Sequence, residues 1–252
     1  MLRHRIIPTL LFNDDGLQKG KSFKNHRYIG DPINAVRIFN DKEVDELVLL
    51  DIEASLKNKE INFDLLKEIS SEAFMPLSYG GGIKNIKDIE KIFLIGFEKV
   101  ILNTTIIENP NLIKEASYFF GAQSIVASID IKKNPLGKYN IYTHSGTKKS
   151  SFDFNEYIKN IAELGAGEII LTSINNEGTK KGFDTNLIKS VCNLIDIPIV
   201  ISGGAGSLNH IKDASNFGAQ ASAIGTMFTF YGPHDAVLLT YPDYKEIRAL
   251  LS

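Results

Sequence analysis

The chain has 252 residues, of which 43% are hydrophobic and 23% are charged, and its formal net charge at pH 7 is −2. This composition is typical of a globular protein, and the charge excludes the global positive field expected of a nucleic-acid-binding protein. The single cysteine, Cys192, excludes an internal disulfide and lies in an apolar helical pattern, where we expect a structural thiol. No apolar run has the length of a signal peptide or a membrane span, so we expect a cytoplasmic protein that binds neither nucleic acid nor membranes.

Short apolar runs rich in β-branched residues alternate with longer amphipathic segments. Predicted strands cover residues 6–12, 46–52, 75–80, 99–104, 125–130, 168–173, 197–202 and 222–227. Predicted helices cover residues 31–42, 62–73, 86–96, 111–121, 154–165, 185–195, 208–218 and 243–252. Continuously apolar strands indicate a parallel sheet covered by helices, and eight strand–helix units favour a single (β/α)8 TIM barrel over residues 1–252. An open doubly wound sheet is the alternative, but the dinucleotide fingerprint is missing after the first strand.

The two halves of the chain resemble each other. A glycine cluster at Gly80–Gly82, followed by Ile-Lys-Asp, recurs about half a chain length later at Gly203, Gly204 and Gly206. This repetition predicts an internal half-barrel repeat. On nearly the same spacing Asp130 falls opposite Leu11, so one half has a carboxylate where the other half has a leucine.

The residues that end the predicted strands are the candidates for an active site, because barrel enzymes place their chemistry at the C-terminal ends of the strands. Glycines after a strand let backbone amides approach an anion, and the dipole of the next helix adds to the attraction. We expect two phosphate sites across the barrel mouth, at Gly81, Gly82, Asn103 and Thr104 and at Gly203, Gly204, Gly225 and Thr226. A lone glycine cluster would more often be a tight turn, whereas two in register suit an elongated ligand with a phosphate at each end.

Asp130 ends a predicted strand and is the candidate general acid or base, since a carboxylate there can be partly desolvated and held beside a ligand. A helix-capping or loop aspartate is the alternative, and Asp51 could act in a similar way. The aperiodic segment 13–31 predicts a lid or binding loop, although a tolerated insertion is possible. Its basic residues would draw an anionic ligand inward: Lys19, Lys21, Lys24 and Arg27.

Four charged residues begin predicted strands at the opposite, N-terminal end of the barrel: Arg5, Glu46, Lys99 and Glu168. Their signs alternate, so their side chains can form a ring of ion pairs that closes the barrel bottom. A structural role is the usual interpretation of such a ring, and a gate is the functional alternative.

Ten short motifs occur in order: RIIP, GDP, DELVLLDI, GGGI, EKVILNT, IVASID, THSGT, GAGEIILTS, EGTKKGFD and SGGAG. Together they resemble the cyclase subunit of imidazole glycerol phosphate synthase over essentially the whole chain. The resemblance implies a half-repeat barrel that binds a small bis-phosphate substrate through both glycine cradles. It also implies a glutaminase subunit that docks on the N-terminal face as a heterodimer and passes ammonia through the barrel. Arg5, Glu46, Lys99 and Glu168 would then form the ammonia gate, Lys19 would be the lid lysine, and no cofactor or metal is expected.

The chain departs from that family at a catalytic position. The resemblance implies two catalytic aspartates, ending strands 1 and 5, but TLLF at residues 9–12 puts Leu11 in the place of the first, and only Asp130 remains. Loss of one member of an acid/base pair lowers a rate by about 10²-fold to 10⁴-fold, which argues against cyclase activity. Asn175 and Glu177 stand where aspartates are usual, and Thr229 stands where a histidine is common.

These features resemble a paralogue branch of the family, as does the stretch RYIGDPINAVRIFNDKEVDELVLLDI. That branch occurs with genes for surface polysaccharides such as lipopolysaccharide, and works with its own glutaminase and a sugar amidotransferase to install acetamidino groups. We expect a barrel of this kind, which receives ammonia and binds a phosphorylated ligand.

Two other hypotheses remain open. The first is a true cyclase and lyase of histidine biosynthesis, which converts the bis-phosphate ribulosyl intermediate and ammonia to imidazole glycerol phosphate and aminoimidazole carboxamide ribotide. It requires another residue, such as Asp51 or the pair Asn13-Asp14, to replace the missing aspartate. The second is a phosphate-binding barrel isomerase that has no partner.

Overall fold

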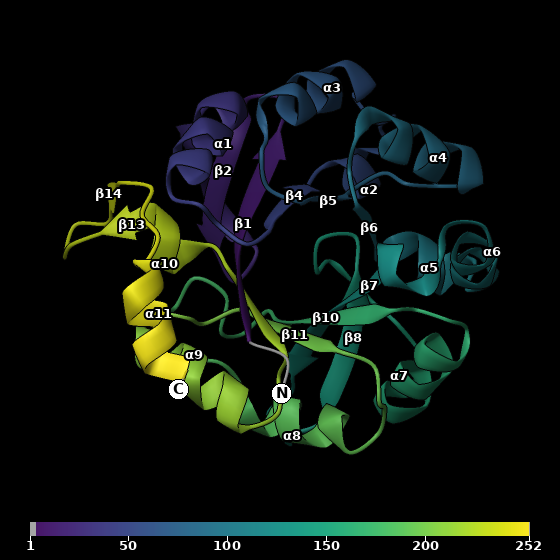
Figure 1. Cartoon of the computed structure of the whole chain (residues 1–252). Helices are drawn as coiled ribbons and strands as arrows, with labels where there is room; N and C mark the ends of the chain where they lie inside the picture. The colour runs from purple at the N-terminus through teal and green to yellow at the C-terminus, as the bar shows by residue number, and fades with distance from the viewer. Residues whose placement is uncertain (1–3, 252) are drawn as a thin grey trace.

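The computed structural model describes residues 4–251 and places eight parallel strands in a closed barrel (Figure 1). In order around the barrel the strands are β1 (Arg5–Asn13), β4 (Leu47–Asp51), β5 (Leu77–Gly80), β6 (Lys99–Leu102), β7 (Ile125–Lys133), β10 (Glu168–Ser173), β11 (Ile199–Ser202) and β12 (Ala221–Ile224). The circle closes because β12 pairs with β1 and β10 pairs with both β7 and β11. The predicted (β/α)8 barrel is therefore confirmed.

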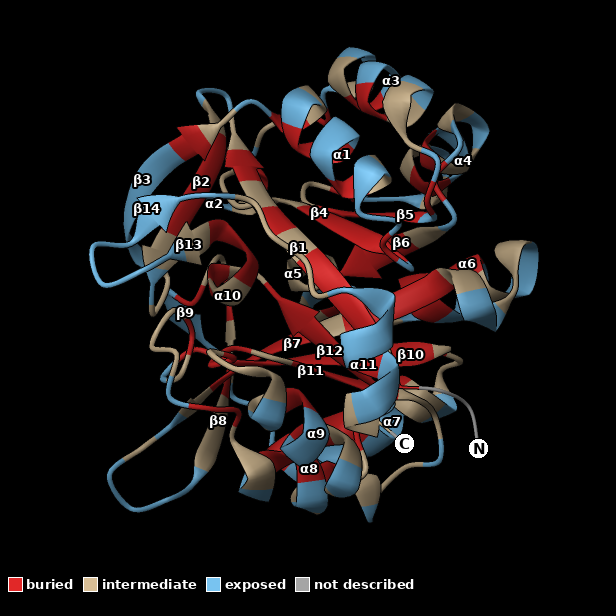
Figure 2. Ribbon diagram, turned by 60° about the vertical axis from the view of Figure 1, so that its left-hand side comes forward, coloured by how far each residue is buried: buried red, intermediate tan, exposed pale blue. Residues whose placement is uncertain are grey.

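Helices form the outer layer of the barrel. They are α1 (Pro32–Asp41), α3 (Phe63–Glu72), α4 (Ile86–Ile95), α6 (Asn111–Phe120), α7 (Phe154–Glu163), α8 (Thr185–Cys192), α9 (Leu208–Asn216) and α11 (Tyr244–Leu251). Figure 2 shows buried strands inside and helices whose outward faces are exposed. Asp31 caps α1 by accepting a hydrogen bond from the Asn34 amide, and Pro32 occupies the first helical turn. Residues 1–3 and residue 252, the last of the predicted C-terminal helix, lie outside the described residues.

Several short elements were not predicted. They are the hairpin strands β2 (Gly16–Lys21) and β3 (Lys24–Gly30), β8 (Tyr139–Thr143), β9 (Lys148–Lys149), β13 (Phe230–Tyr231) and β14 (Ala236–Val237), the helices α2 (Ala54–Lys57), α5 (Thr104–Glu108) and α10 (Thr226–Thr229), and one 3-10 turn at Ala122–Ser124. The predicted loop 13–31 thus contains an antiparallel hairpin, which we call the lid hairpin (β2 and β3), and β2 also pairs with the end of β1. Residues 24–28 of β3 are all exposed, so the strand carries no apolar alternation that could reveal it in the sequence.

The side chains inside the barrel form layers. Along β1 the inward positions run from Arg5 through Ile7 to Thr9 and Leu11. The apolar layer above the charged ends is a separate buried cluster: Ile7, Val48, Ile101, Val126, Ile170, Val200, Ala221 and Ala223. Branched side chains are typical of a packed barrel interior. This layer separates the charged N-terminal end from a cavity at the C-terminal end. No helix among residues 4–251 combines the length and apolar character that a bilayer span requires.

Candidate functional site

A closed ring of ion pairs lies at the N-terminal end of the barrel. Arg5 Nη1 lies 2.7 Å from Glu46 Oε2, and its other terminal nitrogen contacts Glu168. Lys99 Nζ completes the ring at 3.0 Å from Glu46 Oε1 and 3.1 Å from Glu168 Oε2. Both carboxylates are buried, and Ser78 Oγ donates a further hydrogen bond to Glu46. The structure brings together the four residues that the sequence placed at this end.

A cavity opens at the other end of the barrel, among the strand ends and the lid hairpin. The whole first cradle lines it, namely Gly81, Gly82, Asn103 and Thr104. Of the second cradle Gly225 lines it, whereas Gly203, Gly204 and Thr226 do not, contrary to the expectation from the sequence. Asp130, Leu11 and Lys19 also line this cavity, so the lid lysine and the two opposed strand-end residues share one space.

The second cradle is tightly built. Gly204 has a φ of +116°, and a Cβ there would overlap the carbonyl oxygen of Gly182. The Gly182 amide donates a 2.8 Å hydrogen bond to the Gly204 carbonyl, which holds the two segments together. Thr226 is buried, and its hydroxyl has no hydrogen-bond partner among the described residues. A buried hydroxyl without a partner is costly, so it indicates room for a ligand acceptor or a water.

Asp130 is buried on β7 and is held by its neighbour on β6. Asn103 Nδ2 donates hydrogen bonds of 3.0 Å to Asp130 Oδ2 and to the Ser128 carbonyl. Desolvation raises the pKa of Asp130 to about 7, the hydrogen bond from Asn103 opposes this rise, and the charge of Glu177 adds to it. Near neutral pH this carboxyl can therefore donate or accept a proton. The Asn103 amide is committed to Asp130, so only the backbone of Asn103 remains for an anion.

A buried ion pair holds the lid hairpin over the cavity. Lys19 Nζ contacts Glu177, which follows β10, and both side chains are about nine-tenths buried. The Ser22 amide donates a 2.9 Å hydrogen bond to the Glu177 carbonyl. A Cβ on Gly225 would lie 2.5 Å from Lys19 Nζ, so the ammonium group also reaches the second cradle.

The other lid cations differ from Lys19. Lys21 and Lys24 are exposed, and the Arg27 guanidinium lies over the Phe230 ring at 4.5 Å from its centroid. None of these three lines the cavity. Of the four basic lid residues considered in the sequence, Lys19 is the one that the structure directs inward.

The three residues that could replace the missing aspartate all have defined contacts. Asp51 Oδ1 accepts hydrogen bonds from the amides of Glu53 and Ala54, at 2.9 Å and 3.0 Å. Asp14 pairs with Lys59 at 2.5 Å. Asn13 Oδ1 accepts bonds from the Asp15 amide and the Gln18 side chain. Asn13 and Asp14 are thus held by their own contacts, whereas Asp51 lines the cavity with one carboxyl oxygen outside these bonds, and burial raises its pKa.

The smaller sequence departures also have defined contacts. Asn175 Oδ1 accepts a 2.9 Å hydrogen bond from the Lys133 amide, and Thr229 Oγ1 donates a 3.0 Å bond to the Gly225 carbonyl. Two lid residues that the sequence did not single out, Phe23 and His26, line the cavity. Their signal was an aromatic and an imidazole side chain within an otherwise polar lid segment.

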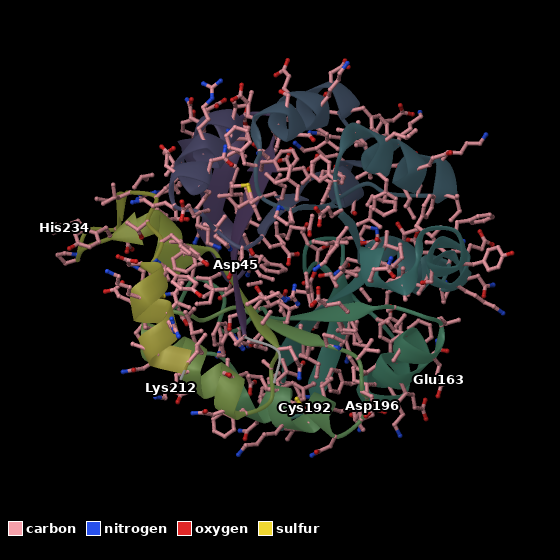
Figure 3. All side chains as sticks on the ribbon, in the orientation of Figure 1. Asp45, Glu163, Cys192, Asp196, Lys212 and His234 are labelled. Carbon is pink, nitrogen blue, oxygen red and sulfur yellow. The ribbon has the colours of Figure 1, made fainter. Side chains whose placement is uncertain are left out.

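Cys192 lies in the outer helical layer, on α8 and away from the barrel centre (Figure 3). Its thiol is 3.8 Å from the Phe217 carbonyl, and burial raises its pKa. This setting suits a structural thiol better than a nucleophile. Among residues 4–251 no three His, Cys, Asp or Glu side chains gather in a way that could hold a metal ion.

Comparison with known proteins agrees with this architecture. The Histidine biosynthesis protein family matches residues 5–234. The chain is 47% identical over 252 residues to a Leptospira borgpetersenii protein provisionally named imidazole glycerol phosphate synthase subunit HisF, with 99% of each chain covered. It is 44% identical to a Pseudomonas aeruginosa protein provisionally named subunit hisF2, over 98% of this chain and 99% of the relative. It is 40% identical to subunit HisF of Petrotoga mobilis, over 94% of each chain. The chain therefore belongs to the Histidine biosynthesis protein family and is a HisF-like barrel subunit.

Proposed function

We propose that this protein accepts ammonia from a glutaminase, binds a ligand with a phosphate at each end, and serves the synthesis of acetamidino sugars for a surface polysaccharide. One combination of features carries the proposal: the charge ring is closed, and the first cradle and Gly225 line one cavity, while Leu11 occupies a position where the family resemblance implies a catalytic aspartate. A charge ring and anion cradles like those that the family resemblance implies, combined with a leucine at an acid/base position, fit a reaction that differs from that of the family. The similarity to the numbered relative hisF2 supports an additional copy with its own role.

The interior of the barrel supports ammonia passage. Above the ring lies the apolar layer around Ile7, Val48 and Ile170. Val48 and Ile170 form part of the floor of the cavity, which Thr9 and Thr172 also line. The Thr9 hydroxyl is buried and without a hydrogen-bond partner in the described part of the chain. An uncharged ammonia molecule can cross an apolar layer at far lower cost than an ammonium ion.

Exposed apolar side chains on the N-terminal side support a glutaminase partner. Phe74 lies between α3 and β5, and Leu94 and Tyr118 lie in the last turns of α4 and α6, which lead to the starts of β6 and β7. Their exposed fractions are 90%, 81% and 83%. Large exposed apolar groups on one side of a molecule are typical of a protein interface, and here they lie where helices lead back to the starts of the strands. A sugar amidotransferase would be a further partner downstream.

The contacts around the second cradle support an anionic ligand. The Thr226 hydroxyl has no partner within residues 4–251 and can donate to an anion. Gly225 has no side chain to collide with the Lys19 ammonium group, which therefore brings a positive charge to this cradle. Across the cavity the first cradle offers the backbone of Gly82 and the hydroxyl of Thr104. Anion sites on both sides of the mouth suit one ligand that spans them.

A genetic test separates the proposed role from the histidine-pathway alternative. We expect that this gene, expressed at chromosomal level in a histidine auxotroph that lacks its own cyclase subunit, fails to restore growth without histidine, with expression verified by immunoblot. A matched Leu11→Asp variant, which restores the missing carboxylate, is the control. Growth with this variant would show that the barrel folds and that the glutaminase of the host reaches it. Growth of the auxotroph with the unaltered gene would instead identify a true cyclase.

The partner is tested separately. We expect the purified protein to bind its glutaminase and to stimulate glutamine hydrolysis. Deletion of the gene in its source organism should remove acetamidino groups from the polysaccharide and leave growth without histidine intact. Absence of any glutaminase effect would favour the partner-free isomerase.

A further inference from the structure

Five titratable side chains line the cavity: Lys19, His26, Asp51, Asp130 and Glu177. Lys19 and Glu177 pair with each other, Asp51 is bound by backbone amides, and Asp130 is bound by Asn103. Within the part of the chain that the structure describes, the imidazole of His26 has no hydrogen-bond or ion-pair partner. Both ring nitrogens of His26 are therefore available to a ligand, as is the Asp130 carboxyl oxygen that Asn103 does not bind.

The position of His26 gives it access to both the ligand and bulk water. It lies on β3 of the lid hairpin, where its ring packs over Gly20, and a Cβ on Gly20 would lie 2.9 Å from His26 Cδ2. The residue lines the cavity, yet part of it is exposed to solvent. A group that exchanges protons between a bound ligand and water requires both kinds of contact.

The charged groups that face the imidazole favour its neutral form. Burial and the Lys19 charge on β2 lower the pKa of His26, while Glu53, before α2, and Glu177, after β10, oppose this shift. His26 is thus largely a free base at pH 7. Asp130, whose pKa is raised to about 7, still carries a proton in much of the population. One neutral base and one protonated acid in the same cavity form a usable pair.

We propose that His26 is a catalytic base of this site, paired with Asp130 as the acid, and that it supplies the proton-transfer function that Leu11 cannot. The inference rests on the proposed function, because it takes a phosphate-ended ligand and ammonia as the reactants. The substrate class is the one that the family resemblance implies, a ketose that carries a phosphate at each end, and the new element is the role of His26.

The proton transfers balance within the pair. The nitrogen lone pair of ammonia forms the new bond to the carbonyl carbon, and the π electrons of the carbonyl move to its oxygen. That oxygen takes the proton of Asp130, and the neutral imidazole of His26 takes a proton from the nitrogen. The product is a carbinolamine, Asp130 ends as a carboxylate, His26 ends as an imidazolium, and exchange with water restores both.

The test uses the full-length protein, ammonium chloride and the bis-phosphate ribulosyl intermediate as the probe, without a glutaminase. Consumption of the probe is followed by chromatography between pH 5.5 and pH 9, and its binding is followed by calorimetry. The variants are His26→Asn and, as a matched control, His234→Asn, at an exposed position in the β13–β14 loop that points away from the barrel (Figure 3). A third variant combines Leu11→Asp with His26→Asn.

We expect slow turnover by the wild-type protein, and a kcat about 10²-fold lower in His26→Asn with probe binding unchanged. In the wild-type protein kcat should fall toward low pH, because the imidazole of His26 becomes protonated. This fall should be absent in His26→Asn. His234→Asn should behave as wild type, and Leu11→Asp should restore turnover to His26→Asn because it supplies a carboxylate in the vacated role.

The inference is overturned if His26→Asn keeps the kcat and the acid limb of wild type. It is also overturned if the wild-type protein binds the probe but does not consume it, which would describe an ammonia conduit and leave the proposed role intact. Rescue of the histidine auxotroph, in contrast, would remove the proposed pathway role and leave the assignment of His26 untouched.

Discussion

At the scale of single residues, the protonation of Asp130 affects the stability of the fold and, in the proposed reaction, the transfer of a proton. Burial raises its folded-state pKa to about 7, from a model-compound value of 3.8. Because the folded state resists ionisation, this group reduces the free energy of unfolding as pH rises above 3.8, and the whole penalty is present above pH 7. The same desolvation that keeps a proton available at neutral pH therefore destabilises the fold in alkali.

Asp130→Asn should remove this pH-dependent penalty while keeping an acceptor for the Asn103 side chain. Relative to wild type, the variant should gain about 2 to 3 kcal/mol in free energy of unfolding between pH 5 and pH 8. Urea unfolding at both pH values measures the change. Asp196→Asn, at an exposed position, is the control. A difference between wild type and Asp130→Asn that stays constant with pH would show that Asp130 ionises normally.

At the scale of elements, the lid hairpin depends on one buried ion pair. Removal of either Lys19 or Glu177 leaves the other charge buried and uncompensated, which costs about 3 to 5 kcal/mol if the lid stays closed. The lid has an alternative, since it can open and hydrate that charge. We expect Lys19→Met and Glu177→Gln each to accelerate amide exchange in β2 and β3 while the barrel strands stay protected. In the double variant, amide exchange should be slower than the sum of the two single effects predicts. Unchanged exchange in the single variants would show that the ion pair does not hold the lid hairpin closed.

The turn after β11 is a second element whose geometry can be tested. Gly204→Ala forces a side chain into a positive φ and against the Gly182 carbonyl, so we expect a loss of about 2 kcal/mol in free energy of unfolding and weaker binding of inorganic phosphate. Gly232→Ala is the matched control, because it has a φ of +74° with nothing within 4 Å of the new Cβ. Equal losses in the two variants would mean that the close approach at Gly204 is unimportant.

At the scale of the whole molecule, the charge ring and the cavity lie at opposite ends of one barrel. Glu46→Gln would remove a charge that holds both Arg5 and Lys99. We expect a loss of about 3 kcal/mol in stability. In the presence of the glutaminase, less ligand should be converted per glutamine hydrolysed, while the reaction with added ammonium chloride continues. If both nitrogen sources are affected equally, the ring has only a structural role.

The sequence predicted the barrel well, since buried parallel strands such as residues 168–173 contain an apolar run without alternation, here residues 169–171, and the order of the strands determines the closure. It also placed the four ring residues, because each begins a strand. It could not predict the lid hairpin, where five exposed residues of β3 give no periodic signal. Nor could it reveal that Asp14 pairs with Lys59, or that His26 has no partner among residues 4–251, because those facts depend on contacts between segments far apart in the chain.

The ring has a consequence for how the chain could be divided. Arg5, Glu46 and Lys99 belong to the first half of the sequence, and Glu168 alone comes from the second. A fragment of the first half would carry two cations against one carboxylate and two unpaired edge strands, β1 and β6. A fragment of the second half would carry only Glu168 of the ring, and its edge strands would be β7 and β12, which pair with β6 and β1 in the intact barrel. Separately expressed halves should therefore associate with each other in preference to forming homodimers. Only the mixed pair restores the native strand pairing at both edges and the ring of two cations and two carboxylates.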